Sequence, residues 1–350
     1  MINLKEMLPV IMSDEFERLA VVDDYISFIW ASRYYEAGDF ELCLDVNKIN
    51  IQLIKKDYFV VRDDDDNAGI IEDIKIERNE DGQEILIVSG RFLTGILERR
   101  IVSTQTTVNG TISSCINRLI TENVINPTNT IRKIDNFILG SGSVSETMEA
   151  QYTGKNLLET IADICKTYSL GFKVTLNSNN QFVFQLYEGV DRTYDQNVNP
   201  WVIFSDQYDN LLSSEYEENY RTIATAALVA GEGEGLDRKT VWVSDGSRGL
   251  SRREVYVDQR NIRSDNGEIS DNDYNQLLKE AGKEALTKYT TAFTGTVYFD
   301  NVVYKQDINL GDLCVIENTK WGIYLNSRLV EVIESVSESG EYTIVPTFGV

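Results

Sequence analysis

Strict alternation of apolar and polar residues in the first hundred positions is the feature that most restricts the fold. In FELCLDV (residues 40–46) every second side chain is apolar, and YISFIWASRY (residues 25–34) places Phe28 and Trp30 on one face. A period of two residues is typical of β-strands with one buried face. The pattern continues through DYFVVR, IIEDIKIER and EILIVSG, and a short helix is expected over RFLTGILER. These residues predict an antiparallel meander of the kind that builds barrels or sandwiches.

The apolar period changes to a helical one between residues 106 and about 190. GTISSCINRLITENVI (residues 110–125) and GKNLLETIADICKTYSL (residues 154–170) each carry an apolar stripe, with Pro127 and Gly171 just beyond their ends. Proline and glycine in those places are helix stop signals. The next segment, GFKVTLNSNNQFVFQLYEG, has the alternation of a hairpin. We expect a small α+β domain here.

Strands dominate again from Trp201 to the end. One amphipathic helix, DNDYNQLLKEAGKEALTKY (residues 271–289), interrupts them, and NSRLVEVIESVSESGEYTIVPTFGV is expected to be a long terminal hairpin. The predicted class is mainly β with an α+β insert. We expect β-rich domains over residues 1–105 and 196–350, an α+β domain over residues 106–195, and a helical insertion near residues 271–290. Domains in such chains are often discontinuous.

The chain has no histidine. This excludes Ser-His-Asp and Cys-His catalysis, imidazole acid–base chemistry and histidine metal ligation. With 56 acidic residues, two carboxylates at the spacing used for glycoside hydrolysis would occur in any fold, so such pairs are uninformative. We therefore assign no catalytic, cofactor-binding or metal-ligating residue and expect no cofactor.

Charge and cysteine content restrict the partners. A formal charge of −23 argues against binding nucleic acid through its phosphates and against an anionic membrane surface. Cys43, Cys115, Cys165 and Cys314 are far apart in the sequence and contain no C-x-x-C pair, so we expect reduced, buried thiols. A helix that spans a membrane needs about 20 consecutive apolar residues, and no stretch of this sequence approaches that length. Lys5 and Glu6 interrupt any signal-peptide core. We expect no membrane anchor.

Four consecutive aspartates, Asp63 to Asp66, separate two apolar runs in VRDDDDNAGII. A calcium loop of the EF-hand type needs oxygen ligands at positions 1, 3 and 5, glycine at 6 and glutamate at 12. Counting from Asp64 puts Ala68 at position 5 and Lys75 at position 12, and counting from Asp63 puts Ala68 where the glycine must be. The stretch therefore predicts a hairpin turn that faces mainly solvent.

Three further stretches have a structural and a functional interpretation. GEGEGLDRKT (residues 231–240) lacks Walker A and dinucleotide spacing, so a hairpin loop is favoured. The aromatic residues Trp30, Tyr34 and Tyr35 suggest a sugar-binding platform, but alternation favours the core for Trp30 and Tyr34. The arginine-rich segment SRREVYVDQRNIR (residues 251–263) predicts either an internal ion-pair stripe or a contact between subunits.

Six motifs occur in an order that resembles the siphovirus tail-hub family. The members of this family are tail-associated, baseplate-hub-like proteins encoded by phages and prophages of Gram-positive bacteria. The motifs are W-x-x-R-Y-x-x-x-G-x-F-E-L from Trp30, V-S-G-R-F-L-x-x-I-L-E-R-R from Val88, A-G-E-G-E-x-x-x-R from Ala230, R-R-E-x-Y-V-D from Arg252, L-G-D-L-C-V-I from Leu310 and P-T-F-G from Pro346. Together they span nearly the whole chain.

The resemblance implies two β-barrel-like domains of the phage baseplate-hub type and a homotrimeric ring. Six similar faces would then dock on a hexameric distal tail ring, with the tape measure protein and receptor-binding or tail fibre proteins as further partners. The expected role is structural, in the virion at the tail tip, after assembly in the host bacterial cytoplasm. Acidic residues lining the channel would let DNA slide without sequence-specific binding. Because the sequence ends at Val350 without the extension that many hubs carry, wall digestion is expected to belong to another protein.

One alternative of a different class stays open. The chain could be a carbohydrate-binding protein, or a two-carboxylate hydrolase acting on cell-surface polysaccharide. A trimer that binds the distal tail protein without cleaving glycan supports the hub, and a monomer that releases reducing sugars supports the alternative.

Overall fold

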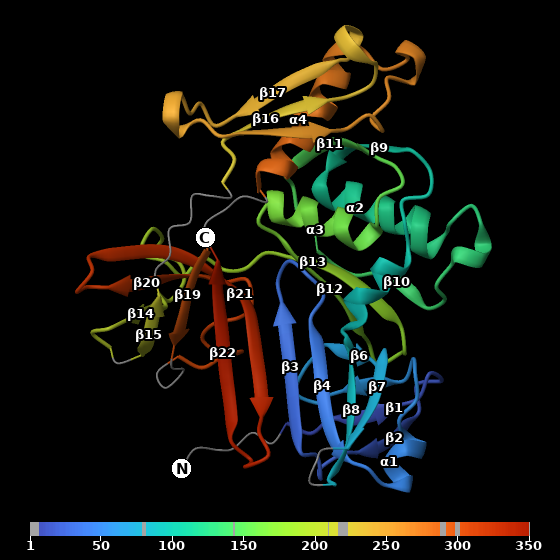
Figure 1. Cartoon of the computed structure of the whole chain (residues 1–350), viewed down its shortest axis with the longest axis vertical. Helices are drawn as coiled ribbons and strands as arrows, with labels where there is room; N and C mark the ends of the chain where they lie inside the picture. The colour runs from blue at the N-terminus through green and yellow to red at the C-terminus, as the bar shows by residue number, and fades with distance from the viewer. Residues whose placement is uncertain are drawn as a thin grey trace.

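The computed structural model describes residues 7–78, 82–142, 144–208, 210–215, 223–287, 292–297 and 302–349. Within these residues the strands form five sheets, and the largest has ten strands. Strands from both ends of the chain lie next to each other in the large sheet, helices α2, α3 and α4 gather at one end of it, and α1 lies at the other end (Figure 1).

Four strands near the N-terminus form one half of the large sheet. Their inward residues, among them Phe28, Trp30 and Leu42, pack against a second, four-stranded sheet of order β2-β1-β5-β6. The alternation in the sequence produces this core, because every second side chain points to the same face. The strands of the half-sheet are β3 (Ser27–Arg33), β4 (Asp39–Asp45), β7 (Asp73–Arg78) and β8 (Glu84–Arg91). The covering sheet consists of β1 (Val10–Met12), β2 (Arg18–Val21), β5 (Phe59–Val61) and β6 (Ala68–Ile70), and helix α1 (Lys48–Leu53) precedes β5.

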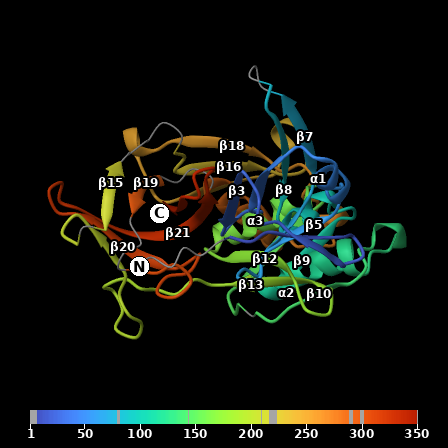
Figure 2. The same ribbon diagram turned by 90° about the horizontal axis from the view of Figure 1, so that it is seen from below.

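Six strands near the C-terminus form the other half of the large sheet. The long strand β21 pairs with β20 through its first part and with β3 through its second part, and a register shift between Leu329 and Glu331 separates the two. Figure 2 shows the two halves side by side, with β15, β19 and β21 on one side and β3 and β8 on the other. The strands are β14 (Ile203–Ser205), β15 (Leu211–Glu215), β19 (Ala292–Val297), β20 (Leu313–Asn318), β21 (Ile323–Val336) and β22 (Tyr342–Gly349).

The middle of the chain forms the α+β part. Helix α3 begins at Leu157 because the Asn156 side chain accepts hydrogen bonds from the backbone amides of Leu158 and Glu159. The Thr111 side chain caps α2 in the same way and accepts a hydrogen bond from the backbone amide of Ser114. Its elements begin with η1 (Leu93–Arg99), β9 (Thr106–Thr111), α2 (Ile112–Ile120), η2 (Thr121–Ile125), η3 (Thr130–Arg132) and β10 (Phe137–Leu139). They continue with β11 (Thr147–Tyr152), α3 (Leu157–Thr167), β12 (Gly171–Leu176) and β13 (Phe182–Tyr187).

A three-stranded sheet and helix α4 form an arm at the end of the molecule that carries α2 and α3 (Figure 1). Valines of the sheet, such as Val229, Val243 and Val257, pack on Leu277 and Leu278 of α4. The elements are β16 (Ala226–Ala230), η4 (Gly235–Asp237), β17 (Thr240–Ser244), η5 (Gly249–Ser251), β18 (Glu254–Asp258), η6 (Asp265–Gly267) and α4 (Asp271–Thr287).

The predicted class, mainly β with an α+β insert, is confirmed. Among the described residues the sheets are open, and the ten-stranded one has β15 and β7 as the ends of its main path. The domain bounds stay a prediction. The predicted helices over residues 110–125, 154–170 and 271–289 are present, although 288–289 lie outside the described residues. The helix expected over RFLTGILER is a 3-10 helix, η1, and α1 was not predicted.

Several further expectations are settled by burial. Trp30 and Tyr34 are completely buried, so the core interpretation of these aromatic residues is confirmed. Of the four free cysteines, Cys115, Cys165 and Cys314 are buried and Cys43 is partly exposed.

In the part of the chain that is described, no helix is long and apolar enough to cross a membrane.

Candidate assembly interface

The large sheet repeats one strand pattern twice. Along its main path the order is β15-β19-β22-β21 followed by β3-β4-β8-β7. In each group of four, the first and second strands in the sequence take the first and second positions in the sheet. The third strand in the sequence then takes the fourth position, and the fourth strand takes the third position. All neighbours on the path are antiparallel, so corresponding strands of the two groups also run in the same direction. The sheet therefore consists of two units of equal topology, which join where β21 of one pairs with β3 of the other.

An ion pair crosses this seam between the units. Arg33 of β3 and Glu331 of β21 are opposite each other in the register, and the Arg33 Nε atom donates to Glu331 Oε1 over 2.7 Å. The Thr347 hydroxyl of β22 donates to the other carboxylate oxygen over 3.1 Å, and Arg33 also binds Asp39. These contacts tie four neighbouring strands, β22, β21, β3 and β4, together on the side of the sheet away from the core.

A buried cluster of charges holds the same seam from the core side. The side chains of Arg62 and Glu334 are 1% and 4% exposed, and Arg62 Nη2 lies 3.2 Å from Glu334 Oε1. Lys305 Nζ lies 3.3 Å from Glu334 Oε2, and the Tyr342 hydroxyl donates to Oε1 over 2.9 Å. Burial alone would lower the pKa of Arg62, but its hydrogen bond to Asp64 and the nearby Glu334 carboxylate raise the pKa overall. Charges this far from water are stable only with partners.

The four aspartates of the acidic turn contribute to this cluster. The turn joins β5 to β6, as predicted. The expectation that the aspartates face mainly solvent is wrong for Asp65, whose side chain is 4% exposed. Each aspartate has a cationic partner. Arg62, directly after β5, pairs with Asp64, and three cations from distant parts of the chain pair with the others: Arg18 with Asp63, Lys305 with Asp65 and Lys173 with Asp66. The turn thus links the N-terminal sheet to the C-terminal half and to β12.

A polar cavity of about 480 Å³ lies beside the turn, lined by residues such as Lys173, Tyr187 and Asp312. Within the described ranges, no group of three or more Cys, Asp or Glu side chains is placed to hold a metal ion.

The two ends of the eight-strand path are edges. Among the described residues, β7 pairs with β8 on one side and has no strand on the other, and β15 likewise pairs only with β19. Ile74 and Ile76 of β7 are 41% and 54% exposed. They lie opposite the buried Val88 and Leu86, so they point to the core side of the sheet. An edge strand with exposed apolar side chains is a template for pairing with another chain.

The side of the sheet away from the core is acidic on β4 and β7. Glu41 and Asp73 both lie opposite Ser89 of the strand between them, so the two exposed carboxylates occupy one row. Asp45 and Glu77 are opposite Ile85 in the same way. Lys75 pairs with Glu77 and offsets part of this charge.

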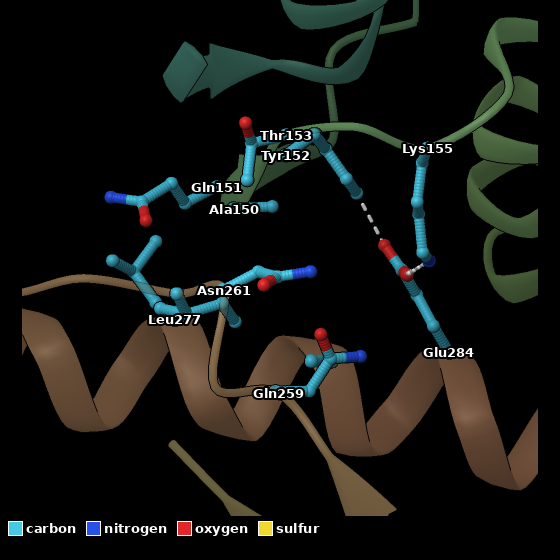
Figure 3. A pocket seen from close by; sticks show the side chains of 11 residues that line it. Ala150, Gln151, Tyr152, Thr153, Lys155, Gln259, Asn261, Leu277 and Glu284 are labelled. Carbon is cyan, nitrogen blue, oxygen red and sulfur yellow. Dashed lines mark hydrogen bonds and ion pairs between the residues drawn. The ribbon is translucent and has the colours of Figure 1, made fainter. Parts of the chain in front are cut away.

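Two buried carboxylates join the arm to the α+β part. Figure 3 shows Glu284 of α4 reaching the Tyr152 hydroxyl, which donates to it, with Lys155 Nζ 3.9 Å from the other oxygen. The Tyr168 hydroxyl donates to Glu280, one turn earlier. Burial raises the pKa of Glu284 to about 7, because desolvation penalises the charged form more than Lys155 and Tyr152 favour it. Sequence reasoning missed both residues, although they lie three and seven positions after Leu277 on the apolar stripe.

The arginine-rich segment forms ion pairs within the arm. Arg252 pairs with Glu254 over 2.6 Å and Arg260 with Asp258 over 2.5 Å. These contacts support the internal ion-pair interpretation, and a contact of this segment with another subunit stays a prediction. The glycine-rich stretch from residue 231 to 240 joins β16 to β17, so the hairpin-loop interpretation is confirmed.

Known structures share this fold. The tail protein from Neisseria meningitidis MC58 has 16% sequence identity and a TM-score of 0.59, with 98% of this chain and 96% of that chain covered. The 43 kDa tail protein of prophage MuSo2 from Shewanella oneidensis has 14% identity and a TM-score of 0.59, with 97% and 98% covered. Prophage tail protein gp18 from Listeria monocytogenes EGD-e has 12% identity and a TM-score of 0.55, with 97% and 93% covered.

A search of curated proteins finds no significant match. The profile of the siphovirus ReqiPepy6 Gp37-like proteins, in contrast, matches residues 9–350, which is nearly the entire chain. The resemblance to siphovirus tail proteins in the sequence motifs and the similarity to tail-protein structures agree with this match. The chain belongs to the siphovirus ReqiPepy6 Gp37-like family of phage tail proteins.

Proposed function

We propose that this chain is a structural, non-enzymatic tail-hub protein, of which three copies close a ring at the tip of the phage tail. The observation that carries the proposal is the duplicated four-strand unit. Three copies would bring six units of equal topology into one ring. Such a ring matches a hexameric distal tail ring on one side, although its own symmetry is threefold.

The seam inside the chain is the template for the seam between copies. Within the chain, β21 is the third strand of its unit in sequence order, and it pairs antiparallel with β3, the first strand of the other unit. The two free edges have the same positions in their units: β7 is a third strand and β15 is a first strand. Pairing β7 of one copy with β15 of the next repeats the same step. A head-to-tail contact of this kind closes a ring when its rotation is a simple fraction of a turn.

The ring would place the hub between other tail components in the virion. The proposed partners are the distal tail ring and the tape measure protein on one side, and receptor-binding or fibre proteins on the other. The structural neighbours with the same fold are named as tail proteins, which supports this setting.

An acidic channel wall would let DNA pass without sticking. If the side of the sheet away from the core lines the channel, Glu41 and Asp73 face the DNA, and like charges repel. We expect Glu41→Lys with Asp73→Lys to slow DNA ejection, measured as release from purified virions triggered with receptor. The matched control is Glu268→Lys, an exposed acid of the arm. Unchanged ejection kinetics in the double variant would refute the acidic channel.

Ring formation is tested at the edge strand. Ile76→Glu puts a charge on the free edge of β7, so we expect it to abolish the trimer that the wild type forms alone or with purified distal tail protein. The control Leu19→Glu changes an equally exposed apolar residue on β2, which lies outside the path, and should leave the trimer intact. Mass photometry reports the oligomer and circular dichroism the fold. Trimers of a folded Ile76→Glu variant would contradict the proposed seam.

A further inference from the structure

Five aromatic side chains gather on the surface around β14, β20 and the first part of β21. Each leaves between 43% and 61% of its surface exposed. Figure 1 shows β14 and β20 on the outer side of the C-terminal half, far from β7, and Figure 2 shows β20 on the side of the molecule away from β7. We call this set the aromatic patch; its members are Tyr194, Trp201, Tyr208, Trp321 and Tyr324.

The patch is centred on the carboxylate of Glu317. Tyr194 and Trp201 contact each other edge to face with ring centroids 5.4 Å apart, and the Tyr194 hydroxyl lies 3.4 Å from Glu317 Oε2. Tyr324 is directly opposite Glu317 in the β20–β21 register, and Ser205 of β14 is opposite it on the other side. Tyr194 and Tyr324 therefore lie beside one buried acid on a three-strand platform, and Trp201 packs against Tyr194.

Hydrogen bonds hold the exposed rings in place. The Trp201 indole donates to the backbone oxygen of Gln196 over 2.9 Å, and the Gln196 side chain bonds the backbone of Thr193 and Asn199. Asn326 of β21 donates to Asp195 over 2.8 Å and fixes the loop to the sheet. Aromatic side chains that are already ordered lose little conformational entropy on binding, which is why they act as interface anchors.

The charge around the patch is negative. Glu317, Asp195 and Asp206 are carboxylates beside it. Hydrogen bonds from Thr319, with a contribution from the charge of Lys320 in the β20–β21 turn, lower the pKa of Asp206. The chain as a whole carries −23. Lysine and arginine side chains can stack on the faces of Tyr and Trp and pair with such carboxylates. A cationic partner is complementary to this surface in both respects.

We propose that the aromatic patch is the docking surface for a lysine- or arginine-bearing segment of another tail polypeptide. The proposed role as a hub enters only in naming a tail polypeptide as the partner. A second copy of this chain is not the favoured occupant, because β14 and β20 branch off the eight-strand path and ring closure through β7 and β15 does not use them.

The test places a photo-crosslinking amino acid at position 201 in assembled tails. We expect a covalent product with a different tail polypeptide, and mass spectrometry should locate the link in a peptide that carries Lys or Arg. The control position is Ile131, which is 90% exposed in the α+β part and should give no such product. Tyr194→Ala in the same background should reduce the yield about tenfold, the loss of one interface anchor.

Three outcomes would overturn the inference. They are products with a second copy of this chain, products equal to those at Ile131, or binding of cell-wall glycan on an array that Tyr194→Ala abolishes. The oligomer of each variant is measured by mass photometry at the same time. A trimer without the crosslink contradicts the docking surface alone, whereas a crosslink without a trimer contradicts the ring alone.

Discussion

At the scale of single residues, the structure assigns a purpose to the acidic turn. Sequence spacing argued against a calcium loop of the EF-hand type, and it predicted the turn, because Asp, Asn and Gly are local signals. It could not show the partners of the aspartates, since Arg18 lies 45 positions before Asp63 and Lys305 lies 240 positions after Asp65. Ion pairs at such separations are created by the fold and leave no periodic trace in the sequence.

The buried arginine of this cluster predicts a large loss of stability on substitution. Arg62→Met takes a partner from the buried Glu334 carboxylate and from the exposed Asp64 carboxylate, so we expect the free energy of unfolding to fall by about 3 kcal/mol. Urea unfolding followed by tryptophan fluorescence measures the loss, since the guanidinium lies 5.6 Å from the ring centre of buried Trp30. The control Arg18→Met removes the exposed pair with Asp63 and should cost less than about 1 kcal/mol. Equal losses in both variants would contradict the buried cluster.

At the scale of secondary-structure elements, periodic segments were predicted well and short ones were not. The two-residue period identified β3, β4 and β8, and the helical period identified α2, α3 and α4, because one face of each is buried. Helix α1 has six residues and one buried side chain, too few to produce a period. The pairing of β21 with β3 could not be predicted from the sequence, because the paired residues lie about 300 positions apart.

The joint between α4 and the α+β part predicts a pH dependence. Glu284 has a pKa of about 7 when folded against 4.5 for an ordinary glutamate, so the folded state keeps a proton that the unfolded chain has released. Stability therefore falls as the pH rises between these values, by up to about 1.4 kcal/mol per pH unit, and the loss is complete above the folded pKa. The buried Glu280 and Tyr152 and the partly exposed Asp163 and Lys155 also face this carboxylate.

We expect Glu284→Gln to flatten this dependence, because the amide keeps a hydrogen-bond acceptor for Tyr152 and cannot ionise. Thermal unfolding midpoints at a series of pH values, for the wild type and the variant, measure the effect. Glu254→Gln, which changes an exposed acid of the arm, should keep the slope of the wild type. A wild-type slope that persists in Glu284→Gln would assign the dependence to another group.

At the scale of the whole molecule, the two ends of the chain meet in one sheet and divide it into two units of the same topology. The sequence predicted two β-rich portions around a mixed insert, but each strand has the same local pattern wherever it pairs, so neither their union nor the repeat was visible. The repeat leaves β7 and β15 as complementary free edges. Closure of these edges between copies is the central claim of this account.

Hydrogen–deuterium exchange of the backbone amides of β7 and β15, compared between the free chain and the assembled ring, tests that claim most directly. Edge amides exchange quickly in water and slowly once they bond to a neighbouring strand. We predict strong protection of both strands on assembly, while the central strands β3 and β21, already paired in the free chain, change little. Assembled trimers in which β7 and β15 exchange as fast as in the free chain would contradict the account.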